Sequence, residues 1–356
     1  MRLKKAIRIV SVNLMLLAVG LLILELAFGD WLTSHNLNKL NLLWNQDLTF
    51  DASGLYDAGD GRVRYKRDMY ALRGDYGTPD QIDILTVGGS TTDQRYITEG
   101  ATWQDVLQRE FVAHGKALHV ANAGVDGQST LGHLKDFEWW FPTIPGLHPR
   151  YCVLYVGLND FWLQTAEPFD DLDAPGADFL RRQIGHKSAL YHLYRTIRGA
   201  VLVRMVRAGH LRTDFSTVRW VNVPRASHHV EMMRPLLQKY AERLRLLDHK
   251  VRAMGARPVF VTQPTHRCRY ERRQVLGTDE EMSFYGVVIN GVDYCIMIHL
   301  QNEKTMDICK DLNGICLDLA SELAFDDEDF YDEYHNTPRG AEKIGTYLFE
   351  KLKGIV

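Results

Sequence analysis

Short apolar runs alternate with amphipathic segments through the larger part of the chain. The segments Trp103–Phe111 and Arg234–Met254 carry apolar residues at helical spacing. Strands that are apolar on both faces are typical of a parallel sheet covered by helices on both sides, so the pattern predicts an α/β fold. Five runs are expected to be the strands of that sheet: Ile82–Val87, Ala117–Ala121, Tyr151–Val156, Arg257–Thr262 and Gly314–Leu319.

The beginning of the chain has a different pattern. Basic residues within positions 1–8 precede a nearly unbroken apolar stretch, 9–28, which has the length of one membrane span. The basic flank predicts an N-terminus inside the cell and the rest of the chain outside the cytoplasm. A cleaved signal peptide is the alternative, because Ala27-Phe28-Gly29 is an acceptable cleavage site. Glu25 favours the uncleaved anchor, since an acid is unusual between a signal core and its cleavage site.

The remaining boundaries divide the chain into a connector and one large domain. An insertion in that domain is strongly basic: residues 181–225 contain ten Lys or Arg residues and a single acid, Asp214. A basic amphipathic helix predicted at 188–210 either rests on anionic lipid or packs on the domain with its arginines in solvent. In chain order, the predicted parts are a cytoplasmic N-terminus at 1–8, a transmembrane anchor at 9–28, a juxtamembrane connector at 29–80, and a domain at 81–356 with its insertion at about 161–225.

Composition and cysteine usage restrict the function only slightly. A formal net charge of −3 gives no reason to expect a nucleic-acid partner. The sequence contains no P-loop, no GxGxxG and no metal-ligand spacing, so no cofactor and no metal are expected. Cys152 lies in a predicted strand and is expected to be buried. Cys309 and Cys316 can pair in an oxidising compartment.

Four polar stretches either follow a predicted strand or precede the last predicted helix. In a parallel sheet the active site lies at the carboxyl ends of the strands, so we expect these stretches to meet at one edge. They are VGGST with Ser90, VANAGVDGQST with Gly124 and Gly127, YVGLND with Asn159, and YDEYHNTPRGAEKIG with Asp332 and His335.

Together these residues have the chemistry that acyl transfer requires. A serine hydroxyl is a weak nucleophile, so Ser90 needs an adjacent base, for which His335 is the candidate. Asp332, three residues earlier, can fix the tautomer of that imidazole. The oxyanion of the tetrahedral intermediate needs hydrogen-bond donors, and the backbone N–H groups of Ser90 and Gly127 with the side-chain amide of Asn159 are the candidates.

The four stretches resemble the ordered blocks of the SGNH hydrolases, also called GDSL esterases/lipases. The resemblance rests on Ser90 in GGST, Gly127 in NAGVDG, Asn159 in GLND, and Asp332 with His335 in DxxH, and it extends over residues 82–345. It implies a three-layer α/β/α sandwich around a five-stranded parallel sheet. It also implies a serine nucleophile and no cofactor.

Three positions stay open at this stage. Gly89 stands where the family often has an acid, and this leaves the substrate uncertain. Gly124 competes with Gly127 for the role of oxyanion donor. Gly127 is preferred, because the role of Gly124 can be limited to the turn. Asp332 lies among the acids of residues 326–333, which also fit a solvated acidic loop.

The predicted protein is a serine esterase anchored in the bacterial inner or plasma membrane, with its catalytic domain periplasmic or extracellular. By analogy with the family, it is expected to hydrolyse O-acyl esters on envelope or exported polysaccharide, and the acyl group is expected to be acetyl. A polysaccharide O-acetyltransferase using the same acyl-enzyme is one alternative, and a non-catalytic envelope scaffold is another. The sequence leaves the exact substrate and the oligomeric state unassigned.

Overall fold

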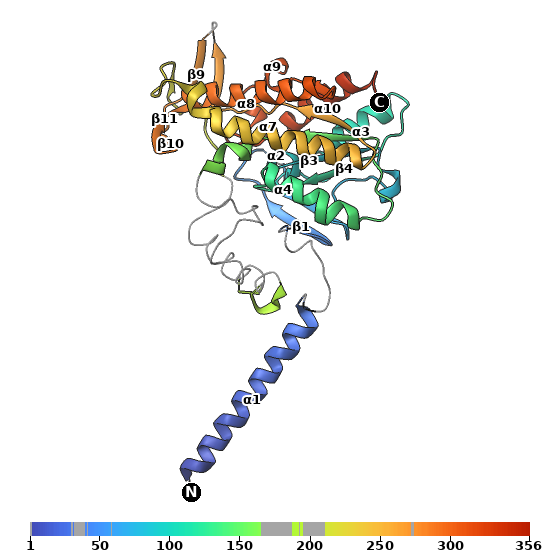
Figure 1. Cartoon of the computed structure of the whole chain (residues 1–356), viewed down its shortest axis with the longest axis vertical. Helices are drawn as coiled ribbons and strands as arrows, with labels where there is room; N and C mark the ends of the chain where they lie inside the picture. Colours follow the sequence, from blue (N-terminus) through green and yellow to red (C-terminus); the bar gives the residue numbers. More distant parts are fainter. Residues whose placement is uncertain are drawn as a thin grey trace. The chain divides into compact units, whose positions relative to one another are not determined.

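A computed structural model describes residues 2–29, 42–57, 59–164, 187–191, 211–271 and 274–356, together with residues 31, 40, 193 and 194. The chain divides into two compact units, the first made of Met1–Asn41 and Asp173–Gly209 and the second of Leu42–Leu172 and His210–Val356. The elements of both are labelled in Figure 1.

The described part of the first unit is dominated by one long helix, α1, Arg2–Phe28. Its segment Ile7–Phe28 has a mean hydropathy of 2.4 and is long and apolar enough to cross a membrane. The acid of this helix, Glu25, accepts hydrogen bonds from Ser188 Oγ (2.6 Å) and from Trp31 Nε1 (2.8 Å). Most of the helix predicted at 188–210 lies outside the described residues.

The second unit is built on a five-stranded sheet in the order β12-β7-β5-β3-β4, with all neighbouring strands parallel. Each strand overlaps one of the five predicted runs, although β4 begins three residues later than predicted and shares only residues 120–121 with its run. The strands β3, β4 and β5 are buried along their whole length, as strands covered on both faces must be. The strands are β3 Ile84–Gly88, β4 Val120–Gly124, β5 Tyr151–Tyr155, β7 Arg257–Val261 and β12 Ile315–Leu317.

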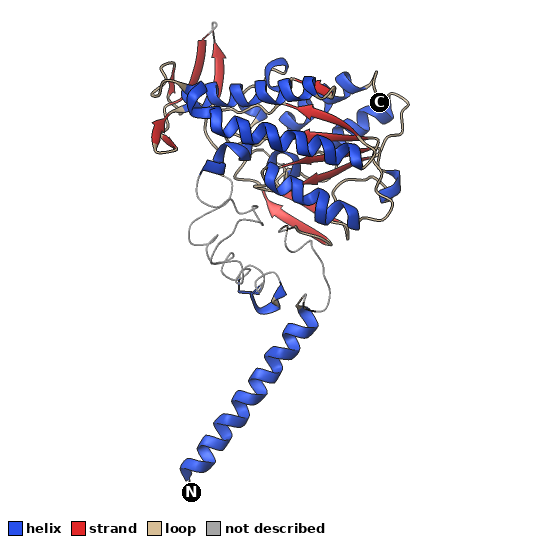
Figure 2. Cartoon of the chain, in the orientation of Figure 1, coloured by secondary structure: helices blue, strands red, loops and turns tan. Residues whose placement is uncertain are grey.

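Helices cover both faces of this sheet (Figure 2). On one face, α3 (Trp103–Ala113) and α10 (Pro338–Leu352) share a core with alternate strand residues such as Ile84 and Val153. The intervening residues, such as Leu85, point to the other face. There α7 (His229–Ala253) packs against α8 (Gly291–Asp311) and α4 (Thr130–Lys135). The expected three-layer α/β/α sandwich is confirmed.

Residues 42–80 lie in the same compact unit as the sheet, so this unit begins at Leu42, whereas the sequence predicted a connector up to residue 80. An antiparallel hairpin of β1 (Gln46–Asp51) and β2 (Arg62–Arg67) forms most of the segment. Its apolar face, including Tyr56 and Val63, packs on Tyr331. The alternation of charged and apolar residues in β2 is the pattern of a half-buried strand, and the prediction of a connector did not use it.

The remaining described elements are short. Two small antiparallel sheets consist of β6 Trp220–Val221, β9 Gln274–Thr278 and β8 Cys268–Glu271, and of β10 Met282–Phe284 and β11 Val287–Ile289. The short helical segments are α2 Ser90–Asp93, α9 Leu319–Glu322, η2 Pro79–Gln81, η3 Asp136–Trp140, η4 Phe141–Thr143, η5 Leu158–Gln164 and η6 Asp327–Asp329.

Candidate active site

Ser90 is the first residue of helix α2, directly after β3 and the two glycines. The amides of Thr92 and Asp93 donate to the carbonyl of Gly89, which closes the first helical turn. The amide of a residue at such a helix start has no partner within the helix. Ser90 is partly exposed and lines a small pocket. The local structure therefore presents both its hydroxyl and its backbone N–H at the edge of the sheet.

His335 and Asp332 approach Ser90 from the loop that precedes α10. The Nε2 atom of His335 lies 2.7 Å from Ser90 Oγ, and its Nδ1 atom lies 2.8 Å from Asp332 Oδ2. Asp332 Oδ1 accepts hydrogen bonds from the amides of Tyr334 (2.9 Å) and His335 (2.7 Å). These amides hold the carboxylate in place, so that a neutral imidazole donating Nδ1–H to Asp332 directs its Nε2 lone pair at the serine hydroxyl.

The loop that carries this pair is fixed at several points. The amide of Tyr331 donates to the carbonyl of His335 (3.0 Å), and the amide of His266 donates to the carbonyl of Glu333 (2.8 Å). The ring of Tyr331 stacks on His335 with an interplanar angle of 10°. Burial, together with the neighbouring Asp332 carboxylate, raises the pKa of Tyr331 well above its ordinary value. This ring is therefore a neutral packing surface for the imidazole.

Asn159 reaches the same pocket from the turn after β5. Its Nδ2 atom donates to the carbonyl of Gln128 (2.9 Å), and since an amide nitrogen carries two hydrogens, a second can point into the pocket. Gly127 lies in the turn after β4 with φ +74°, next to Gln128, which lines the pocket. Gly124 is the last residue of β4 itself. The structure thus brings Ser90, Asn159 and the Gly127 turn to one edge of the sheet.

The glycine at position 89 has a steric explanation. A Cβ atom at Gly89 would lie 2.5 Å from Asn159 Nδ2 and 3.2 Å from the carbonyl oxygen of Gln128. Real Cβ contacts essentially never fall below about 3.0 Å, so a side chain here would displace Asn159. The acid that the family often carries would therefore require Asn159 to move from this position.

Several residues of the pocket carry no signal in the sequence. Gln263, after β7, accepts a hydrogen bond from the amide of Leu158 (2.9 Å) and donates to Thr91 Oγ1 (2.8 Å). It therefore links the turn that carries Asn159 to the helix that carries Ser90. Trp162 and Tyr334 form an aromatic wall of the pocket. Their positions relative to Ser90 follow from the loops alone, so neither spacing nor composition indicates them.

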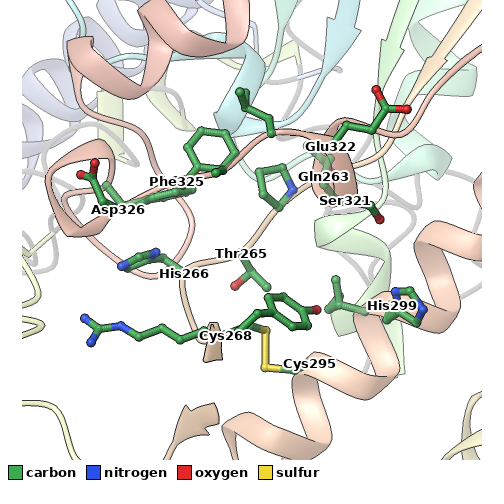
Figure 3. Close-up of a pocket in the computed structure, with 18 of the residues that line it drawn as sticks. Gln263, Thr265, His266, Cys268, Cys295, His299, Ser321, Glu322, Phe325 and Asp326 are labelled. Atoms are coloured by element: carbon green, nitrogen blue, oxygen red, sulfur yellow. A yellow bond between two sulfur atoms is a disulfide. The ribbon is translucent and has the colours of Figure 1, made fainter. Parts of the chain in front are cut away.

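A larger cleft of about 1010 Å³ lies beside the small pocket, and Gln263 lines both. Figure 3 shows its wall, which includes His266, Phe325, Asp326 and the disulfide between Cys268 and Cys295. Its lining mixes charged, polar and aromatic side chains. Among the described residues, no group of three or more His, Cys, Asp or Glu side chains is placed to hold a metal ion.

A comparison with known protein families assigns the chain to one of them. The family model described as GDSL-like lipase/acylhydrolase matches residues 84–348, which is most of the chain. The chain belongs to this family. It is accordingly an ester-hydrolysing serine hydrolase, as the four sequence blocks predicted. No curated protein matches the sequence.

Solved structures of esterases are similar to this chain at low sequence identity. An esterase from Pseudoalteromonas sp. is 13% identical with a TM-score of 0.41, over 76% of this chain and 96% of that one. An acetylxylan esterase from Geobacillus stearothermophilus is 10% identical with a TM-score of 0.42, over 76% and 93%. A further acetyl xylan esterase is 12% identical with a TM-score of 0.42, over 77% and 100%.

Proposed function

We propose that this protein hydrolyses O-acyl esters with Ser90 as nucleophile, His335 as general base and acid, and Asp332 as the residue that orients the imidazole. One observation carries the proposal: the continuous contact from Ser90 Oγ through both ring nitrogens of His335 to Asp332, at 2.7 and 2.8 Å. A nucleophile, a base and an orienting group at hydrogen-bond distance form the arrangement that activates a serine.

In the first step, Ser90 Oγ bonds to the ester carbonyl carbon while His335 Nε2 takes the hydroxyl proton. The oxyanion accepts hydrogen bonds from the amides of Ser90 and Gly127 and from Asn159 Nδ2. His335 then returns the proton to the departing alcohol, and the carbon–oxygen bond of the ester breaks. In the second step, water replaces the alcohol, and the acid is released from Ser90 by the same sequence of proton transfers.

The size of the pocket supports a short acyl group. The pocket that contains Ser90 has a volume of about 90 Å³ and is bounded by Trp162, Tyr334 and Gln128. For comparison, an apolar cavity of about 150 Å³ binds a single benzene molecule. Trp162 stacks on Tyr294, and Tyr294 in turn packs on Tyr334, so the aromatic wall cannot easily retract. An acetyl group fits these limits, and a long acyl chain does not.

Two further features support an extracytoplasmic location and an envelope glycan as substrate. Disulfides join Cys268 to Cys295 and Cys309 to Cys316, and such bonds persist in oxidising compartments. The apolar segment of α1 with its basic flank fits an anchor whose N-terminus is cytoplasmic. The large cleft beside the pocket offers a mixed polar and aromatic lining of the kind that an extended polysaccharide can contact.

Acetate release tests this function directly. Purified full-length protein in detergent should release free acetate from an O-acetylated polysaccharide, at the same rate whether or not a deacetylated glycan acceptor is present. Acetate release that falls as acceptor is added, with acetyl groups appearing on the acceptor, would assign the acyl-enzyme to a transferase. No release and no transfer with any acetylated glycan would contradict the glycan substrate.

The acyl preference depends on Trp162. Replacing it by alanine (Trp162→Ala) removes one of the two side chains of the aromatic wall. We expect the ratio of kcat/KM for butyrate over acetate esters to rise by about tenfold or more, since each added methylene is worth about 1–3 kcal/mol in such a pocket. Nitrophenyl esters of increasing chain length measure this ratio. Trp139→Ala is the matched control, because Trp139 lies in η3 and does not line the pocket. An unchanged ratio in Trp162→Ala would contradict the assignment.

A further inference from the structure

A chain of alternating charges runs from the β1–β2 hairpin to the turn that carries Gly127. Arg67 Nη2 lies 2.7 Å from Asp93 Oδ1, and Arg95 Nη2 lies 3.5 Å from Asp93 Oδ2. The other terminal nitrogen of Arg95, Nη1, lies 3.1 Å from Asp126 Oδ2. The charged side chains are thus connected in the order Arg67, Asp93, Arg95 and Asp126.

The two acids of this series lie close in sequence to the proposed catalytic residues. Asp93 is the last residue of α2, three residues after Ser90, and Asp126 directly precedes Gly127. Arg67 also donates to the carbonyl of Gly124, the last residue of β4. The nucleophile helix and the turn after β4 are therefore joined to each other through one set of side chains.

The two ends of this series of charged side chains differ in burial. The side chains of Arg67 and Asp93 are only 2% and 1% exposed, so this pair is part of the protein interior. The side chains of Arg95 and Asp126 are 30% and 32% exposed. A partly exposed ion pair contributes only about 0–1 kcal/mol to stability. The Arg95–Asp126 contact can consequently be removed without unfolding the protein.

We propose that Asp126, held by Arg95, is a positioning residue that fixes the Gly127 amide relative to Ser90. The inference rests on the proposed roles of Ser90 and Gly127. Gly127 has φ +74° and no side chain of its own to restrain its peptide. The ion pair one residue earlier supplies that restraint from Arg95, two residues beyond the end of the helix that carries the nucleophile. An oxyanion donor is effective only when it already points at the developing charge.

The substitution Asp126→Asn tests this inference in the full-length protein, with a short-chain acetyl ester as substrate. We expect kcat to fall by about tenfold, since a small displacement of a catalytic group has an effect of this order or larger, while KM and the thermal unfolding midpoint stay unchanged. Labelling by a fluorophosphonate probe should slow by a similar factor. Asp126→Glu, which keeps a carboxylate for Arg95, should recover part of the activity.

The matched control is Glu138→Gln. Glu138 pairs with Lys250 at 2.9 Å with exposures of 37% and 26%, which resemble those of the Arg95–Asp126 pair, and it lies outside the small pocket. Wild-type kcat in Asp126→Asn, or an equal loss in Glu138→Gln, would overturn the inference. Ser90→Ala separates this failure from failure of the proposed function. If Ser90→Ala is inactive and Asp126→Asn is fully active, only the positioning role is wrong. If Ser90→Ala is active, the catalytic assignment itself is wrong.

Discussion

Replacing the nucleophile (Ser90→Ala) is expected to lower kcat by roughly 10⁴-fold or more, because His335 then has no hydroxyl group to deprotonate. The Nε2 atom of His335 lies 2.7 Å from Ser90 Oγ, and alanine leaves that nitrogen without a proton to take. The change removes one oxygen atom from a partly exposed residue, so the fold should be unaffected. Acetate release and covalent labelling with a fluorophosphonate probe measure the loss.

The neighbouring hydroxyl provides the matched control for this experiment. Thr91 is the next residue of α2 and also lines the pocket, but its Oγ1 atom accepts a hydrogen bond from Gln263 Nε2 (2.8 Å). Thr91→Val should therefore still react with the probe, whereas Ser90→Ala should not react at all. Probe labelling of Ser90→Ala at the wild-type rate would show that another residue is the nucleophile.

The second large effect concerns stability. Arg67→Met leaves the Asp93 carboxylate buried without its main partner, and breaking a buried ion pair in this way costs about 3–5 kcal/mol of unfolding free energy. Chemical denaturation of the full-length protein in detergent measures this loss. The double variant Arg67→Met with Asp93→Leu should be more stable than Arg67→Met alone, because it removes the uncompensated charge as well.

An exposed ion pair on the same strand is the control. Arg64 pairs with Asp47 at 2.6 Å with side chains 59% and 50% exposed, and Arg64→Met should leave the denaturation midpoint unchanged. Equal midpoints for wild type and Arg67→Met would contradict the importance assigned to the buried pair.

The buried pair of Arg67 and Asp93 should also make the stability of the protein depend on pH. Burial acts to raise the pKa of Asp93, but Arg67 and Arg95 outweigh it and hold the pKa below its ordinary value of 3.8. The group therefore stabilises the fold at pH above 3.8, and this stabilisation is lost as pH falls through the lower pKa of the folded state. In Arg67→Met most of the lowering of the Asp93 pKa is expected to disappear. The difference in stability between wild type and Arg67→Met should consequently narrow below pH 3.8.

Most of the central sheet could be predicted because its strands are buried on both faces. Runs such as Tyr151–Tyr155 are apolar without interruption, and the helical spacing of α3 and α7 separates them clearly. The hairpin of β1 and β2 was missed as part of this unit, because the many polar and charged residues of the segment were taken as those of a connector, although the alternation in β2 is typical of a half-buried strand. Its packing against Tyr331 and Asp93 connects segments that are far apart in the chain.

The proposed catalytic residues were predictable for a related reason. Each follows a strand or precedes a helix in a short polar block, and parallel strands bring such blocks to one edge. The pocket wall was not predictable. Trp162 faces Ser90 only because of the turn after β5, and Gln263 reaches Thr91 across the sheet from the end of β7. Cys268 and Cys295 are likewise joined by the fold, since 27 residues separate them.

The sequence by itself determined the fold class, the family, the ester-hydrolysing activity and the residues proposed for catalysis, because periodicity and short polar blocks are local properties of the chain. Only the tertiary structure decided which surfaces complete the pocket and which segments support it. The stretch around Gly89 shows the difference. The sequence places two glycines before Ser90, but the reason for the second is the Asn159 side chain, 2.5 Å from where a Cβ would stand. Such a contact joins residues 70 positions apart and exists only once β3 and β5 lie side by side.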